Sequence, residues 1–429
     1  MSLSFGDVTI AVYMQREGIG YIYSFDHDLE RSMVSIGWRR SIIPSRSFDY
    51  YDVKYRNSYS QTMPDSDRNV VLLGDYDYDY PREKLLRRGL ERSGATVLEC
   101  RFSETSRFIG VWKLLLLPLF YIRIFRRMAE IGESAAAIDA ILLTKFNPLL
   151  IPIAAYYARR FDCPLIYDLF VSLYRTAEMR NVHPIVVRSV AVLERIVLQL
   201  PDYHLVGTEQ FIDLYSEIYG LPKERFVRLP PGADGDWFYP REDINKRETF
   251  TVLYWGNFLP HHGVGTILGA AAELRNESYE FVFLGRGPEK ERYQNMATEL
   301  ALSNVRFEGF VPREKQQEWI ASSHVCLGIF DDDPRSLASI TNKVSEAVAS
   351  KKAVVTEQSP AIDAWFEHGE SVYTVPPEDP VALADAIRTL DGDRSLIERL
   401  ETGGHEVYRR EFDVGAIGSI LDERLFDDE

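Results

Sequence analysis

The segment SITNKVSEAVASKKAVV, residues 339–355, places an amide, a cation and a carboxylate within five positions. In a helix that begins near Thr341, Glu346 lies one turn below both Asn342 and Lys343, so the three side chains share one face. The free backbone N–H groups at the start of that helix, together with Lys343, would bind a diphosphate. Glu346 would then accept the two hydroxyls of a ribose. A solvated Lys–Glu pair on a surface helix has the same spacing and is the alternative interpretation.

Glycine turns follow two predicted strands in the same half of the chain, FTVLYWGNF and YEFVFLGRG. A pair of glycines after a strand is usually only a turn, and the second turn lacks the third glycine of a dinucleotide-binding fingerprint. We therefore take the two turns as part of a ligand site only in combination with the 342–346 helix. The residues concerned are Gly256, Asn257, His262, Gly263, Gly285 and Gly287.

Other side chains suited to chemistry have competing interpretations. Asp168 follows the predicted buried strand PLIY, at the carboxyl end where α/β sheets bind ligands, but an Asp there often caps the next helix. The aspartates of DYDYDYPRE, residues 75–83, have the spacing of metal ligands, yet no ligand-rich partner segment is visible. His261 and His262 are adjacent, and such pairs seldom chelate together. We therefore expect no metal site.

The elements that must position these residues are α/β repeats. From residue 69 onward, apolar strands such as RNVVLLG and ATVLEC alternate with amphipathic helices such as PREKLLRRGLERSG. This alternation predicts parallel sheets with helical crossovers. It occurs in two tandem units, and PPGADGDWFYPRED marks the linker between them. A cleft between two facing units is the expected place for a ligand.

The length of 429 residues fits two domains of roughly 150–200 residues each. We expect a first Rossmann-like domain at 69–240 and a second at 241–407. A helical end at 408–429 follows them, and 1–68 is an extension without a clear period, to which we assign no structure.

Composition limits the partners and the compartment. The net charge of −16 argues against a nucleic-acid partner, because phosphate binding requires a basic surface. Cys100, Cys163 and Cys326 match no metal or disulfide spacing, so we expect free thiols in a reducing compartment. The first residues lack a basic start followed by an apolar block, which favours a cytoplasmic protein.

The stretch FIGVWKLLLLPLFYIRIFRR, residues 108–127, has membrane character. Lys113, Pro118 and Arg123 interrupt it, so its apolar runs are shorter than the ~20 residues that a membrane span needs. Its arginines and aromatic residues suit a helix in the headgroup plane at the inner face of the cell membrane. A helix of the protein core is the alternative.

The 339–355 segment resembles the donor motif of the family-4 retaining glycosyltransferases of the GT-B fold. In that family a late Glu binds the nucleotide ribose and a helix N-terminus holds the diphosphate. VLYWGNFLPHHGVGTILGAAAEL and FVFLGRGPEKERY also resemble the family's donor domain, and the resemblance extends over 69–425. It implies two facing Rossmann-like doubly wound domains with a cleft between them, whose last helix crosses back to the first. DCPLIYDLFVSLYRTAEMR implies acceptor-side contacts by Asp168, Ser172 and Tyr174.

The chain departs from the family pattern at residues that would contact the sugar and the diphosphate. The first of the two usual glutamates is replaced by Ala338, so a sugar-contacting carboxylate is missing or is supplied by an aspartate at 331–333. The usual Arg and Lys of the diphosphate clamp are replaced by Asn257 and His262. We expect Lys343, the helix N-terminus and a protonated His262 to take their place.

The resemblance implies transfer of a sugar from a nucleotide-diphosphate sugar to an acceptor hydroxyl, with retention, in polysaccharide or lipid-linked glycan synthesis. Lys343 would stabilise the leaving diphosphate and Asp168 would act on the acceptor side, with no cofactor besides the donor co-substrate. Ala338 and Asn257 favour one alternative, a catalytically silent GT-B binding or scaffold protein. A GT-B epimerase, or a synthase that uses a sugar phosphate, is the other.

Overall fold

A computed structural model describes residues 68–74, 76, 80–101, 117–135, 137–144, 148–179 and 183–426. All of them belong to one compact unit of the chain, Asp65–Glu429. The expectations for residues 1–67, for 108–116 and for the aspartates Asp75, Asp77 and Asp79 lie outside the described residues.

The first domain contains a six-stranded parallel sheet in the order β2-β1-β3-β4-β5-β6. Its strands are β1 (Asn69–Gly74), β2 (Thr96–Arg101), β3 (Ala140–Leu143), β4 (Leu165–Asp168), β5 (Tyr203–Val206) and β6 (Phe226–Arg228). The connecting helices are α4 (Pro81–Arg92), α6 (Leu117–Ser134), η2 (Pro148–Leu150), α7 (Ile151–Phe161), α8 (Leu173–Met179), α9 (Pro184–Val197), α10 (Glu209–Tyr219) and η3 (Lys223–Arg225). The inner strands β1, β3 and β4 are almost wholly buried because helices cover both faces of the sheet.

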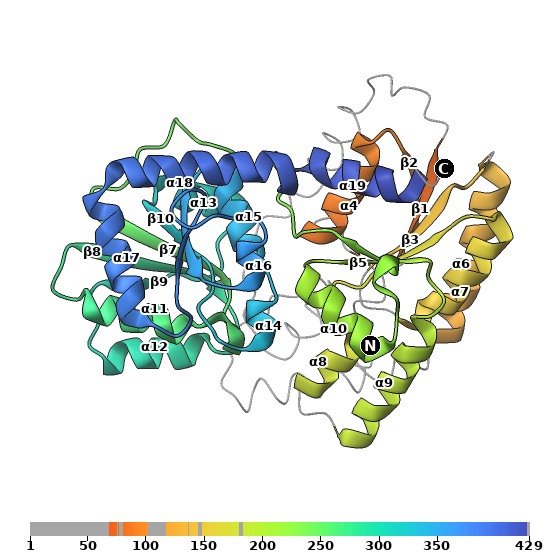
Figure 1. Cartoon of the computed structure of the whole chain (residues 1–429), viewed down its shortest axis with the longest axis horizontal. Helices are drawn as coiled ribbons and strands as arrows, with labels where there is room; N and C mark the ends of the chain where they lie inside the picture. The colour runs from red at the N-terminus through yellow and green to blue at the C-terminus, as the bar shows by residue number, and fades with distance from the viewer. Residues whose placement is uncertain are drawn as a thin grey trace, which may run out of the picture. The chain divides into compact units, whose positions relative to one another are not determined.

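The second domain repeats the plan with a parallel sheet in the order β12-β11-β10-β7-β8-β9. Its strands are β7 (Phe250–Asn257), β8 (Tyr279–Arg286), β9 (Val305–Phe307), β10 (Val325–Leu327), β11 (Ala353–Glu357) and β12 (Tyr373–Val375). Its helices are η4 (Pro260–His262), α11 (Val264–Glu273), α12 (Lys290–Glu299), α13 (Arg313–Ser322), α14 (Pro334–Leu337), α15 (Asn342–Ala349), α16 (Pro360–Asp363), α17 (Pro380–Gly392) and α18 (Arg394–Val407). The prediction of two parallel-sheet α/β domains is confirmed (Figure 1).

Helix α15 packs closely on its own sheet because its inward residues are small. Ala347 and Ala349 are fully buried, and the helix joins the same apolar cluster as strands β10 and β11. The side chain of Val348 lies against Gly404 of α18, where an added Cβ would come within 2.9 Å. The small residues after Glu346 therefore hold the start of α15 at the carboxyl end of the sheet.

The chain returns to the first domain after α18, through the π-helical turn η5 (Tyr408–Phe412) and helix α19 (Val414–Phe426) (Figure 1). Helix α19 packs on α4, and Ile417 joins the core of the first sheet. A Cβ on Gly418 would lie 2.5 Å from the carbonyl oxygen of Gly89, so the two helix backbones are in direct contact.

Candidate functional site

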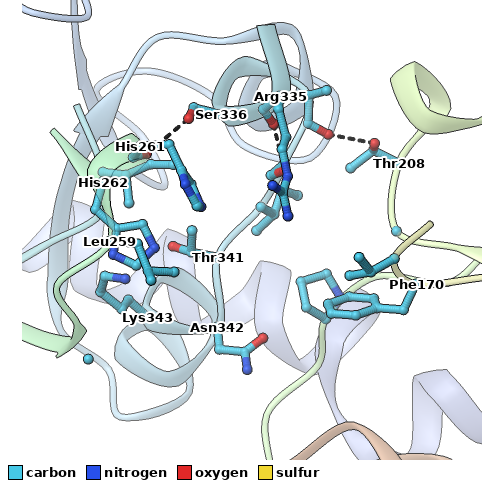
Figure 2. A pocket seen from close by; sticks show the side chains of 18 of the residues that line it. Phe170, Thr208, Leu259, His261, His262, Arg335, Ser336, Thr341, Asn342 and Lys343 are labelled. Atoms are coloured by element: carbon cyan, nitrogen blue, oxygen red, sulfur yellow. Dashed lines mark hydrogen bonds between the residues drawn. The ribbon is translucent and has the colours of Figure 1, made fainter. Parts of the chain in front are cut away.

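A pocket of about 890 Å³ is lined by residues of both domains (Figure 2). From the first domain, the segments that follow β4 and β5 contribute side chains that include Phe170, Arg175 and Thr208. From the second domain, the end of β7 and the helices η4, α14 and α15 line the opposite wall. The volume suits a small-molecule ligand, and the position at strand ends is where α/β sheets bind ligands.

Lys343 lies at the start of α15 and is buried below the pocket wall. Its Nζ is 5.1 Å from the centre of the Tyr254 ring, and a Cβ on Gly256 would lie 3.5 Å from it. Within the described part of the chain this ammonium forms no ion pair. Burial lowers the pKa of Lys343 to about 8, although the carboxyls of Glu346 and Glu357 act in the opposite direction. An anion in the pocket would supply the missing counter-charge.

Glu346 is one turn further along α15 and also lines the pocket. The Trp255 indole Nε1 donates to its Oε2 at 2.7 Å, and Gln316 Nε2 lies 3.5 Å from the same oxygen. Burial raises the pKa of Glu346 to about 7, against the opposing effects of the Trp255 hydrogen bond and the Lys343 charge. The carboxylate is therefore held in one orientation at the pocket edge.

The pocket lining is basic although the whole chain is acidic, with a net charge of −16. Among its described lining residues Glu346 is the one carboxylate. The basic side chains are Arg175, Arg313, Arg335 and Lys343, accompanied by His261 and His262. The free N–H groups at the start of α15 add partial positive charge. This combination of charges suits a ligand with several phosphate oxygens.

We expected His262 to be protonated. Its side chain is buried, and its Nδ1 lies 2.8 Å from the Tyr254 hydroxyl. Burial first, and then the charge of Lys343, hold the pKa of His262 near 2, so the imidazole is neutral. A second cation beside Lys343 in a dry site is unfavourable, so the structure favours a neutral His262, and its part in holding a diphosphate stays a prediction.

Of the glycines expected to bind the donor, some line the pocket and others lie behind its wall. Gly256 lines the pocket, as do Asn257 and Asn342. Gly263 lies just behind the wall with a φ of +61°, and a Cβ there would come within 2.3 Å of the Phe330 backbone. Glycine is required at that point because the η4 loop crosses the segment after β10 so closely.

Gly285 and Gly287 are not among the lining residues, contrary to our expectation for the second turn. Gly285 pairs with Gly256 across the ends of β7 and β8. A Cβ on Gly285 would lie 2.0 Å from the Gly256 carbonyl oxygen, and one on Gly287 would lie 2.3 Å from the Phe258 nitrogen. These two glycines pack the strand ends, and their part in donor binding stays a prediction.

Asp168 does not line the pocket either. Its carboxylate accepts two hydrogen bonds from Arg82, from Nη2 at 2.9 Å and from Nε at 3.3 Å. The same guanidinium donates to the carbonyls of Leu229 and Pro230. Asp168 therefore ties the start of α4 to the segment after β6, and its acceptor-side role stays a prediction. Position at a strand end does not decide which side chain turns toward the ligand.

Ser172 and Tyr174 lie at the start of α8, and of the two only Ser172 is among the described lining residues. Ser172 is fully buried, and its hydroxyl donates to Glu194 at 3.0 Å while accepting from the Arg175 backbone N–H. The Tyr174 hydroxyl donates to Glu178, and its side chain is not in the lining. The sequence analysis missed Glu194, whose buried carboxylate also accepts from two backbone N–H groups at the start of α8. This network fixes α8 and so places Arg175 at the pocket.

The expected substitute for the missing sugar-contacting carboxylate is absent from the described lining. Asp331, Asp332 and Asp333 do not line the pocket, and Asp333 accepts from the Arg335 backbone N–H. The carbonyl of Ala338 accepts from the Thr208 hydroxyl at 2.7 Å, which joins the two domains. In place of a carboxylate, Figure 2 shows the Arg335 side chain extended into the pocket.

Several lining residues carried no signal in the sequence. Arg335 is in the four-residue helix α14, Arg175 is in an ordinary helix, and His261 was noted only as the neighbour of His262. Their importance depends on contacts between segments far apart in the chain, such as the 130 residues that separate Thr208 from Ala338.

Comparison with known proteins gives a consistent set of relatives. Residues 249–393 match the family model described as glycosyl transferases group 1. The D-rhamnosyltransferase WbpZ of Pseudomonas aeruginosa is 23% identical over 299 residues, which cover 68% of this chain and 74% of WbpZ. The alpha-D-kanosaminyltransferase of Streptomyces kanamyceticus is 25% identical over 285 residues, covering 62% of this chain and 72% of that enzyme.

Solved structures show the same fold. The sucrose-phosphate synthase of Thermosynechococcus elongatus superposes with a TM-score of 0.64 at 16% identity, over 84% of this chain and 100% of that chain. HepE of Anabaena, solved in complex with UDP, superposes with a TM-score of 0.61 at 15% identity, over 84% of this chain and 100% of that chain.

Proposed function

We propose, from the premise that this chain is a glycosyltransferase of the GT-B fold, that it moves a sugar from a nucleoside-diphosphate sugar to an acceptor hydroxyl with retention of configuration. The observation that carries this proposal is the position of Lys343 and Glu346. Both line one pocket between the two domains, one at the start of α15 and the other a turn deeper. Lys343 and the helix N-terminus would bind the diphosphate, and Glu346 would bind the ribose.

The reaction breaks the bond between the anomeric carbon and the β-phosphate oxygen, and the electron pair stays on the diphosphate. The acceptor hydroxyl oxygen bonds to the anomeric carbon, and its proton passes to an oxygen of the departing diphosphate. Lys343 stabilises the negative charge that develops on that diphosphate. Such positioning and electrostatic stabilisation require no protein nucleophile.

Retention is supported by the composition of the pocket wall. An inverting reaction needs a base on the face opposite the leaving group, and Glu346, the one carboxylate among the described lining residues, is the proposed ribose contact. If the departing diphosphate accepts the acceptor proton, the new bond forms on the face that the diphosphate leaves. The resemblance of the α15 segment to family-4 retaining enzymes supports the same outcome.

The similar proteins support a proposal for the classes of donor and acceptor. One curated relative, 30% identical over 206 residues that cover 46% of this chain and 53% of that enzyme, is the lipopolysaccharide core biosynthesis glycosyltransferase LpsD of Rhizobium meliloti. A HepE structure that contains UDP-glucose superposes on this chain with a TM-score of 0.61 at 16% identity, over 83% of this chain and 99% of HepE. We therefore propose a nucleotide sugar as donor and a growing polysaccharide or lipid-linked glycan as acceptor.

A melting-temperature screen against UDP-, GDP- and dTDP-sugars tests the donor site. A donor present at 100 times its dissociation constant should stabilise the fold by about 2.7 kcal/mol. Glu346→Ala should abolish that stabilisation and the release of nucleoside diphosphate. Glu318→Ala, at an exposed position of α13, should change neither. Unaltered turnover in Glu346→Ala would contradict the proposal that Glu346 binds the donor.

We also propose that α6 contacts the membrane surface that carries a lipid-linked acceptor. Leu119, Ile122 and Phe125 are 55%, 49% and 49% exposed, and Arg123 and Arg126 are exposed beside them. An apolar stripe flanked by arginines suits anionic headgroups. No helix among the described residues is long and apolar enough to span a bilayer.

Sedimentation with phosphatidylglycerol vesicles tests this surface. Leu119→Glu with Ile122→Glu should release the protein from the vesicles, whereas Val381→Glu, at an exposed apolar position of α17, should not. Equal binding of all three proteins would exclude a role for α6.

A further inference from the structure

The two carboxylate oxygens of Glu346, the proposed ribose contact, have different surroundings. The indole Nε1 of Trp255 donates to Oε2 at 2.7 Å, and Nε2 of Gln316 lies 3.5 Å from the same oxygen. Oε1 accepts no hydrogen bond from the described residues, although Glu346 lines the pocket. Each carboxylate oxygen has about two lone-pair positions, so protein donors occupy Oε2 and Oε1 is left for a ligand.

Trp255 is held beside Glu346 by packing. It lies on β7, where it pairs with Leu284 of β8, and its side chain is 4% exposed in an apolar cluster that also contains Val344 of α15. The indole N–H can donate a hydrogen bond but cannot accept one. If a ribose hydroxyl displaced it from Oε2, this largely buried group would lose its acceptor, which is costly. We therefore expect the bond between Trp255 and Glu346 to persist when a nucleotide binds.

This bond limits how a ribose can be recognised. A ribose presents neighbouring hydroxyls at its 2′ and 3′ positions, and a carboxylate with two free oxygens can accept one hydrogen bond from each. Glu346 offers one free oxygen, so one hydroxyl forms a charge-assisted hydrogen bond and the other gains no equivalent bond from this carboxylate. The described lining of the pocket contains no second carboxylate that could accept from it.

We propose that Trp255 is a specificity-determining residue of the donor site. By occupying Oε2 of Glu346, it restricts recognition of the nucleotide to one ribose hydroxyl, so a donor whose pentose lacks the other hydroxyl is accepted. This inference rests on the proposed function, because it takes Glu346 as the ribose contact. If the dispensable hydroxyl is at 2′, sugars linked to deoxyribonucleotides are among the donors. If it is at 3′, the site requires a ribonucleotide.

The affinities of nucleoside diphosphates for the full chain test this selectivity without turnover. UDP and GDP are each compared with their 2′-deoxy and 3′-deoxy analogues by calorimetry at pH 7.5, between the pKa of Glu346 at about 7 and that of Lys343 at about 8. For each nucleotide that binds, one analogue should bind at least about 10-fold more weakly, because it lacks the charge-assisted hydrogen bond. The other analogue should bind within about threefold of the parent nucleotide.

Two variants test the role of Trp255. Trp255→Phe keeps an aromatic ring in the cluster but removes the N–H, so Oε2 becomes available to the second hydroxyl. Both deoxy analogues should then bind at least about fivefold more weakly than the parent nucleotide. Trp319→Phe is the matched control, because Trp319 packs against the same apolar cluster and is not among the described lining residues. It should keep the selectivity of the unchanged protein.

The unchanged protein decides the proposal even if Trp255→Phe does not fold. Two deoxy analogues that lose affinity to the same extent, or that both keep it, would overturn the proposal. A Trp255→Phe variant with a cooperative thermal unfolding transition that still tolerates one analogue would also overturn it. Failure of the proposed function is distinguishable, because neither UDP nor GDP would then bind, and the ribose contact itself would be refuted.

Discussion

At the scale of single residues, the proposed donor site depends on the buried ammonium of Lys343 and on two carboxyl groups that interact with it. Lys343 interacts with Glu346 on its own helix and with Glu357 at the end of β11. Burial raises the pKa of Glu357 to about 8, and one of its carboxyl oxygens has no partner among the described residues. The neighbouring His262 stays neutral. The charge on this group of residues therefore changes within the physiological pH range.

We predict a bell-shaped pH dependence of kcat/KM. It should rise as pH increases through about 7, where Glu346 ionises to accept a ribose hydroxyl. It should fall as pH increases through about 8, where Lys343 loses its proton. The two limits belong to the coupled group rather than to single residues. Release of nucleoside diphosphate between pH 5.5 and 9.5 measures the profile.

Two variants test which residue controls each limb of the pH profile. Glu346→Gln should lower activity and remove the acidic limb, whereas Lys343→Arg should move the basic limb upward, because arginine stays protonated. A basic limb that is unchanged in Lys343→Arg would show that another group controls it.

Asp168 provides the second prediction at this scale. Asp168→Ala leaves the Arg82 guanidinium buried without its partner, so it should lower the free energy of unfolding by about 3–5 kcal/mol. The double change to Leu at both positions should recover a large part of that loss. Urea unfolding measures the effect. Normal stability combined with a 100-fold loss of kcat would instead indicate a catalytic role.

At the scale of elements, the ends of β7 and β8 determine where the pocket begins. The two strands pair in register over eight residues each, and their last turns require glycine because the backbones approach so closely. Gly285 has a φ of +125° and Gly256 a φ of +126°. This close approach keeps the space above Lys343 open.

We predict that Gly285→Ala destabilises the protein by about 3 kcal/mol or more. The strained φ costs about 1–3 kcal/mol, and the new Cβ also collides with the Gly256 carbonyl. Gly392→Ala, at the end of α17 where an added Cβ meets nothing within 4 Å, should change stability by less than about 1 kcal/mol. Thermal unfolding compares the two variants. Similar melting temperatures would contradict the conclusion that position 285 requires glycine.

At the scale of the whole molecule, α19 connects the two domains by packing on α4 after the chain has left α18. The contact is between backbones at Gly89 and Gly418, so no side chain can be added there without moving a helix. The Thr208–Ala338 hydrogen bond joins the domains again beside the pocket. The relative position of the two pocket walls depends on both contacts.

We predict that Gly418→Leu separates α19 from α4 and lowers the free energy of unfolding by about 1–3 kcal/mol. Acceptor-dependent turnover should fall more than the affinity for UDP, because the proposed UDP contacts lie within the second domain. Ser419→Ala, at an exposed neighbouring position, serves as control. Turnover and UDP affinity that fall together would show that α19 does not act through the acceptor wall.

The sequence by itself determined the features that depend on local spacing. The alternation of apolar strands and amphipathic helices predicted two parallel-sheet domains, because each element must bury one face. The three- and four-residue spacing in the α15 segment predicted that Asn342, Lys343 and Glu346 share a face, because helical geometry is set by neighbouring residues.

Only the tertiary structure decided which side chains meet in the pocket and which charges they carry. Asp168 ends β4 and Arg175 follows it, yet Asp168 turns toward Arg82 and Arg175 lines the pocket. His262 is neutral because burial removes the water that would stabilise its charge. These outcomes depend on desolvation and on contacts between distant segments, and neither is encoded in the spacing of nearby residues.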